Sequence, residues 1–134
     1  AHAVLEYGSD GPGQIARLAA LFPPQLAVVT NVGEAQLRGL GDLAGAAAEY
    51  TALVAALPPA GLALLNGDDP HVRAMAQRAP RALRYGLGAG NDLRADELRY
   101  DRAGTTLRLL WRGEAAAARV PLLGAPGAYA ALAA

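Results

Sequence analysis

The 134-residue chain contains no cysteine and no lysine. Without cysteine it cannot form disulfide bonds, thiolate metal sites or a cysteine nucleophile, which is typical of a cytoplasmic protein. Without lysine it cannot supply a P-loop amine, a Schiff base or a carbamylated lysine. The twelve basic residues are all arginine, and twelve acidic residues balance them. This neutrality argues against a nucleic acid or an anionic membrane as the main partner.

Long hydrophobic runs are also missing, so the sequence predicts no membrane span. The most apolar window, residues 53–65, is interrupted by Pro58, Pro59 and Gly61, and it falls short of the ~20 residues that a spanning helix needs. The first residues lack the basic region and long apolar core of a signal peptide. Because the sequence starts without methionine and within a strand pattern, we expect either a domain excised from a longer chain or a partly ordered chain.

The first two thirds of the sequence alternate short apolar runs with helical patterns, as parallel βαβ units do. Strands are predicted at residues 3–6, 26–30, 62–65 and 81–87. The helices between them begin after Gly13, after Asp42 and after Asp69. Asp42 and Asp69 are predicted to cap the second and third helix, and Pro70 suits a first helical position.

After residue 88 the pattern becomes that of an antiparallel meander, with strands predicted at 92–100, 105–111 and 115–122. The sequence therefore predicts a three-layer α/β domain over residues 1–123. Its mainly parallel sheet occupies about residues 1–88, and a small antiparallel β extension occupies about residues 92–122. Residues 124–134 are predicted to start a helix or a linker toward a missing C-terminal domain.

Three polar clusters follow predicted strands: Glu6, the pair Thr30 and Asn31, and the group Asn66, Asp68 and Asp69. Since the carboxyl ends of parallel strands share one edge of a sheet, we expect the clusters to converge on one crevice. A carboxylate suited to magnesium would then lie beside amides suited to binding a ligand. Each cluster taken singly also fits an ordinary role, as a solvated strand end, a turn, or carboxylates at a helix N-terminus.

Taken in order, these clusters and their neighbours resemble a known family. The matching stretches are LEYG at residues 5–8, GQI at 13–15, TNVGEAQLRGLGDLAG at 30–45 and LLNGDD at 64–69. They resemble the central domain of the Mur ligases, the ATP-dependent amide-bond formers of peptidoglycan precursor synthesis. Within that family the D-alanyl-D-alanine-adding members are the most similar.

The resemblance implies roles for particular residues. Glu6 falls on a magnesium-binding glutamate, and Asn66 falls on an asparagine that contacts the adenine of ATP, with Asp69 beside it in the nucleotide site. The substrate-facing loop corresponds to Thr30, Asn31 and Gln36. The implied cofactors are ATP and Mg²⁺, and the implied substrates are a nucleotide-linked muramoyl peptide and an amino acid or dipeptide, joined in the cytoplasm. The family also implies N- and C-terminal ligase domains as partners.

The sequence departs from the family pattern at several motif positions. Gln36 replaces a magnesium-linked histidine, Arg38 replaces an acidic residue, and Tyr50 replaces the carbamylated lysine. Pro126-Gly127 and Ala130 stand where the family carries His-Asn and a later Asn. The family's glycine-rich ATP loop is expected upstream of this segment.

Three interpretations remain open at this point. The chain belongs to a divergent ligase whose other catalytic parts lie on further sequence, or to a non-catalytic homologue that binds a nucleotide or a partner protein through the same crevice. In the third, the crevice is unused and the domain is a scaffold for assembly. In each case, the isolated chain is expected to be inactive.

Overall fold

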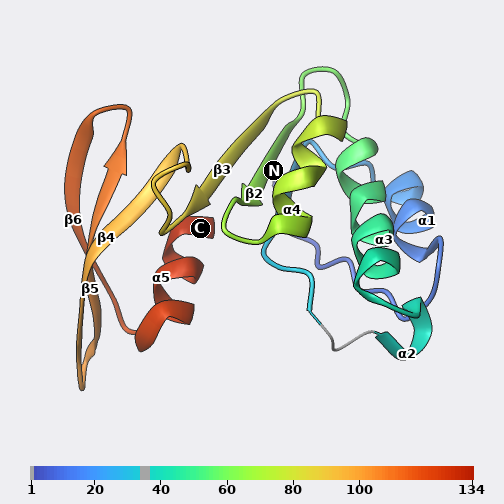
Figure 1. Ribbon diagram of the computed structural model, residues 1–134. Coiled ribbons are helices and arrows are strands. Elements are labelled where there is room, and N and C mark those ends of the chain that lie inside the picture. The colour runs from blue at the N-terminus through green and yellow to red at the C-terminus, as the bar shows by residue number, and fades with distance from the viewer. Residues whose placement is uncertain (1, 34–36) are drawn as a thin grey trace.

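The computed structural model describes residues 2–33 and 37–134. In chain order its elements are α1 (Gln14–Leu21), β1 (Leu26–Val29), α2 (Leu37–Leu40), α3 (Leu43–Ala55), β2 (Leu62–Asn66), α4 (Pro70–Ala74), the 3₁₀ helix η2 (Met75–Arg78), β3 (Ala82–Gly86), β4 (Leu93–Asp101), β5 (Gly104–Trp111), β6 (Glu114–Val120) and α5 (Gly124–Ala133). The strands form one sheet in the order β1-β2-β3-β4-β5-β6 (Figure 1). Strands β1 to β4 pair in parallel, whereas β4, β5 and β6 pair antiparallel. The predicted mainly parallel sheet with an antiparallel extension is confirmed.

Alternate residues of β2 point into two different cores. Ala63 and Leu65 lie in the apolar cluster shared with α3, α4 and η2, whereas Leu64 packs against the cluster shared with α5. Since successive side chains of a strand point to opposite faces, α3 and α4 cover one face of the sheet and α5 covers the other (Figure 1). The domain therefore has the three layers that the sequence predicts.

The predicted helix starts are also confirmed. Asp42 caps α3 by accepting a hydrogen bond from the Gly45 amide at 2.7 Å, and Asp69 caps α4, which begins with Pro70. The predicted apolar face of α3 packs into the first core through Leu43, Ala46, Ala47, Tyr50, Leu53, Val54 and the following Leu57. No helix in residues 2–33 and 37–134 combines the length and apolar character needed to cross a membrane.

The residues that follow β6 form helix α5, which is an integral part of the fold. Ala128 and Leu132 are buried against β3, β4 and β5. In Figure 1 the helix lies beside the antiparallel strands. The continuation into a C-terminal domain stays a prediction.

The strand predicted at residues 3–6 is wrong. Residues 2–9 form neither helix nor strand, and the side chain of Val4 is 99% exposed. Within the described residues β1 pairs with β2 alone, so no neighbouring strand satisfies the backbone of residues 3–6. A strand requires such a partner, and an apolar pattern by itself does not supply one.

Candidate nucleotide site

The amide of Asn66 joins the ends of β1 and β2. Its Nδ2 donates to the Thr30 carbonyl at 2.8 Å, and its Oδ1 accepts from the Asp68 amide at 3.0 Å. The residue is 9% exposed. Because one end of the amide must donate and the other must accept, these two contacts fix which way the side chain faces. One N–H and one Oδ1 lone pair of Asn66 are left for a ligand.

Asp69 links the loop after β1 to the start of α4 through hydrogen bonds. Its Oδ1 accepts from the amides of His71 and Val72 at 2.8 and 3.1 Å, and its Oδ2 accepts from the Val32 amide at 2.9 Å. Both carboxylate oxygens are therefore engaged with backbone N–H groups, as expected of a cap. The role predicted for Asp69 in the nucleotide site is not tested by these contacts and stays a prediction.

Thr30 and Asn31, the predicted substrate residues, lie on the loop that Asn66 and Asp69 hold. Both are exposed, and the Thr30 hydroxyl donates to Asn31 Oδ1 at 3.3 Å. The structure thus brings two of the three predicted polar clusters together at the carboxyl end of the parallel strands. Gln36, the other predicted substrate residue, lies outside the described residues.

Glu6, the predicted magnesium ligand, lies on the irregular segment that precedes α1. Its side chain is exposed, and no residue in the described ranges forms an ion pair or hydrogen bond with it. Tyr7, the next residue, is anchored by its hydroxyl, which donates to the Phe22 carbonyl at 2.5 Å. Among the described residues there is no group of three or more histidine or acidic side chains that could enclose a metal ion.

Asp68 is the most heavily bonded carboxylate of this region. Its Oδ2 accepts from the Leu87 amide at 2.6 Å and the Tyr129 hydroxyl at 2.8 Å. Its Oδ1 accepts from the Gly88 amide at 3.1 Å and from Asn91 Nδ2 at 2.7 Å. One side chain of the β2–α4 turn therefore holds the loop between β3 and β4 and the helix α5.

These hydrogen bonds also set the charge of Asp68. Burial alone would raise the pKa of its carboxyl, but the bonds from Leu87, Tyr129, Asn91 and Gly88 outweigh burial and hold the pKa below its ordinary 3.8. Burial and the adjacent carboxylate raise the pKa of Tyr129 to about 12. At neutral pH an ionised Asp68 therefore faces a protonated Tyr129, which is the pairing that the hydrogen bond requires.

Glu49 and Tyr129 are structural residues that the sequence interpretation missed. Glu49, 6% exposed on α3, accepts from the amides of Gly13 and Ile15 and from the Ser9 hydroxyl. It thereby caps α1, whose own N-cap residue Gly13 has no side chain to do so. Two sequence features could have indicated them. Glu49 is the lone acidic residue of an alanine-rich helix, and Tyr129 is the only aromatic residue of the terminal helix.

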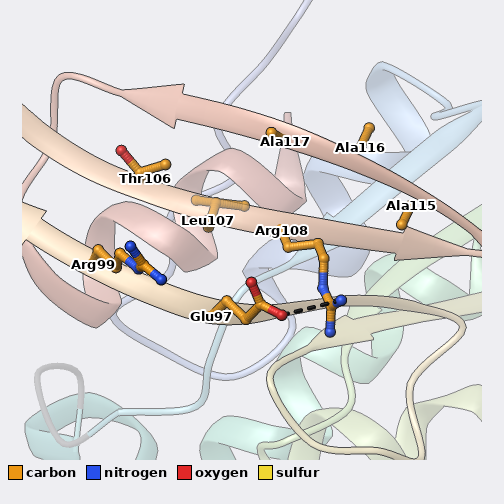
Figure 2. Close-up of a pocket in the computed structure, with 8 residues that line it drawn as sticks. All are labelled: Glu97, Arg99, Thr106, Leu107, Arg108, Ala115, Ala116 and Ala117. Atoms are coloured by element: carbon orange, nitrogen blue, oxygen red, sulfur yellow. Dashed lines mark ion pairs between the residues drawn. The ribbon is translucent and has the colours of Figure 1, made fainter.

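Two surface hollows lie apart from this turn. One, of about 280 Å³, lies on the antiparallel strands, where Glu97 points toward Arg108 and pairs with it at 3.0 Å (Figure 2). Its volume is below the ~300 Å³ at which small-molecule sites begin. The other, of about 600 Å³, lies between α3 and the segment of α4 and η2, and both alanine and polar side chains line it. Neither contains Glu6, Asn31 or Asn66, so the candidate site rests on the hydrogen-bonded turn.

The sequence of the chain also matches a known protein family. The Mur ligase middle domain family matches the chain over residues 1–134. The chain belongs to the Mur ligase family, as a middle domain. The resemblance noted from the motifs of the sequence is thus confirmed.

Curated relatives of this Mur ligase domain include UDP-N-acetylmuramoyl-tripeptide–D-alanyl-D-alanine ligases. The one from Mycobacterium leprae is 41% identical over 87 residues, which cover 64% of this domain and 17% of that ligase. The one from Bacillus subtilis is 31% identical over 103 residues, which cover 77% of this domain and 22% of that ligase. The domain thus spans about a fifth of the length of the relatives it matches.

Solved structures confirm the fold of the domain. MurF from Acinetobacter baumannii aligns with a TM-score of 0.85 at 21% identity, over 94% of this domain and 28% of that chain. The MurF ligase from Thermotoga maritima, solved in complex with ADP, aligns with a TM-score of 0.72 at 25% identity, over 82% of this domain and 26% of that chain.

Proposed function

We propose that this domain is the nucleotide-binding centre of an ATP-dependent ligase of peptidoglycan precursor synthesis. In the proposed reaction a carboxylate of a UDP-muramoyl peptide attacks the γ-phosphorus of ATP, forming an acyl phosphate and releasing ADP. The amine of an amino acid or of D-alanyl-D-alanine then attacks the acyl carbon, forming the amide bond and releasing phosphate. The support comes from membership of the Mur ligase family and from relatives named as D-alanyl-D-alanine ligases.

The observation that carries the proposal is the hydrogen bond from Asn66 to the Thr30 carbonyl. It places an amide with free bonding capacity beside an exposed polar loop, at the end of a parallel sheet where such folds bind ligands. In the proposal Asn66 contacts the adenine and Asp69 supports it, while Thr30, Asn31 and Gln36 orient the peptide substrate. A relative solved with ADP is consistent with nucleotide binding by this domain type.

Glu6 is the residue proposed to hold Mg²⁺. Its exposed side chain offers one carboxylate, and Mg²⁺ commonly takes one or two carboxylates together with substrate phosphates and water. When bound, the ion would offset the negative charge gathered between the phosphates and the peptide carboxylate. The remaining parts of the reaction are assigned to N- and C-terminal ligase domains, and the isolated domain is proposed to be inactive. The whole enzyme is proposed to be cytoplasmic, where nucleotide-linked precursors are made.

Calorimetry on the complete protein that carries this domain tests the proposal. ATP should bind in the presence of Mg²⁺, and Glu6→Ala should weaken that binding about tenfold, since a metal contact to charged oxygen is lost. Binding measured without Mg²⁺ should be the same in both proteins. Glu114→Ala, which removes another exposed carboxylate on β6, is the matched control. Failure to bind ATP, or binding indifferent to Glu6, would contradict the proposal.

A second candidate function is a non-catalytic relative that binds a nucleotide or a partner protein. One observation favours it: Tyr50, at the position of the family's carbamylated lysine, packs against the apolar core of α3 and offers no carboxylate. A turnover assay with UDP-muramoyl peptide, D-alanyl-D-alanine and ATP separates the two. Release of phosphate that depends on both substrates supports the ligase, whereas ATP binding without such release supports the non-catalytic relative.

A further inference from the structure

The turn that contains Asn66 is held by contacts with several neighbouring segments. The Gly67 amide donates to the Tyr85 carbonyl at 2.9 Å, and Arg73 Nη1 donates to the Gly67 carbonyl at 3.0 Å. A Cβ atom at Gly67 would lie only 1.9 Å from Asn91 Oδ1. The backbone of this turn is therefore packed directly against the side chain of Asn91, which Asp68 in turn holds.

The side chain and the backbone of Asp68 act on different partners. The carboxylate accepts hydrogen bonds from the β3–β4 loop and from α5, whereas the backbone N–H donates to Asn66 Oδ1 at 3.0 Å. The position of that N–H depends on where the carboxylate is anchored, because both belong to one short turn. If the carboxylate lost its partners, the donor that orients the Asn66 amide would be free to shift.

We propose that Asp68 is a positioning residue that sets the base preference of the nucleotide site through Asn66. The inference rests on the proposed function, in which Asn66 contacts the base. An oriented asparagine amide can accept from the exocyclic amine of adenine and donate to the adjacent ring nitrogen. Guanine presents a carbonyl oxygen in place of that amine, so it opposes an acceptor with an acceptor. A fixed amide therefore favours adenine, whereas an amide that can rotate discriminates less, because its N–H can turn toward the carbonyl oxygen of guanine.

The test compares ADP and GDP binding to the complete protein by calorimetry. The wild-type protein should prefer ADP, and Asp68→Asn should reduce the ratio of the two affinities about tenfold, the scale of one lost hydrogen bond to the base. Tyr129→Phe removes one of the partners of Asp68 and should reduce the ratio by a smaller factor, which keeps the test informative if Asp68→Asn fails to fold. Asp96→Asn is the matched control, because Asp96 is a half-buried carboxylate on β4 that accepts hydrogen bonds from Arg94 of the same strand and from Arg108 of β5.

A second readout needs no nucleotide. In protein labelled with ¹⁵N-asparagine, the side-chain amide signal of Asn66 is assigned by its loss in Asn66→Ala. Asp68→Asn should shift that signal, whereas Asp96→Asn should leave it in place. A general loss of stability would not distinguish the two variants in this way.

The outcomes separate the inference from the proposed function. Preference for ADP that falls in Asn66→Ala but not in Asp68→Asn would overturn the inference and leave the proposed function standing. Equal binding of ADP and GDP by the wild-type protein would also overturn it. No binding of either nucleotide would overturn the proposed function, and an unmoved Asn66 signal would overturn the positioning by Asp68 independently of any ligand.

Discussion

The hydroxyl of Tyr129 lies 2.8 Å from Oδ2 of Asp68, although 61 positions separate the two residues in the sequence. The bond joins helix α5, which covers the antiparallel strands, to the turn between β2 and α4. A single carboxylate thus ties the last helix of the domain to the turn that carries the candidate nucleotide residue Asn66.

Tyr129→Phe should lower the free energy of unfolding of the chain by about 1–2 kcal/mol, because a hydrogen bond to a charged carboxylate is lost while the ring stays in place. Urea denaturation at neutral pH measures the change. Tyr100→Phe, which removes a hydroxyl from a side chain that is 54% exposed, should change the free energy by less than about 0.5 kcal/mol. Equal effects of the two substitutions would contradict the role of the Tyr129–Asp68 bond.

The contribution of Asp68 should disappear in acid. The pKa of Asp68 is lower in the folded chain than its ordinary 3.8, so the unfolded chain takes up the proton first as the pH falls. The ionised carboxylate therefore stabilises the fold above about pH 4, and this stabilisation is lost as the pH falls through the lowered pKa. Denaturation curves of wild-type and Asp68→Asn chains should differ clearly at pH 7 and converge once the pH has fallen through the lowered pKa of Asp68. A constant difference across that range would contradict the assignment.

Gly86→Ala should destabilise the chain by about 1–3 kcal/mol through overpacking. A Cβ atom at this position would lie 2.4 Å from both Asn91 Nδ2 and Asp68 Oδ2, and it would push apart the contacts that hold the β3–β4 loop. Gly90→Ala is the matched control in the same loop, because nothing lies within 4 Å of a Cβ atom there. The thermal midpoints of the two variants, measured together, should differ by several degrees.

Glu49→Gln should loosen the start of α1. The buried carboxylate accepts from the amides of Gly13 and Ile15, and a neutral amide would turn a donor toward one of these N–H groups. We expect a loss of about 2–3 kcal/mol, together with faster hydrogen exchange at Gly13 and Ile15. Glu114→Gln, an exposed change on β6, serves as the control. Unchanged exchange at both amides in Glu49→Gln would contradict this capping role.

Much of the fold was predictable because it rests on local patterns. Asp42 and Asp69 stand directly before helical sequences and cap them as predicted, since a cap needs only its own next few residues. The apolar face of α3 was predictable for the same reason. The strand at residues 3–6 was predicted wrongly because strand formation depends on a partner elsewhere in the chain, and the described residues supply none.

The candidate site was predictable only in part. The sequence indicated that Asn66 and the Thr30-Asn31 loop would meet, because the ends of adjacent parallel strands share one edge, and the Asn66–Thr30 hydrogen bond fulfils that expectation. It gave no indication that Tyr129 would reach Asp68 or that Glu49 would cap a helix 34 residues away. The roles of Glu6, Asn31, Asn66 and Asp69 toward ligands stay predictions.

By itself, then, the sequence determined the family, the helix caps and the alternation of strands and helices, since each depends on the identity and spacing of nearby residues. Only the tertiary structure decided which carboxylate would anchor the turn, which helix would cover which face, and which segment would lack a strand partner. These outcomes depend on contacts between residues far apart in the chain, where the free energy of burial and hydrogen bonding, not local spacing, selects the partner.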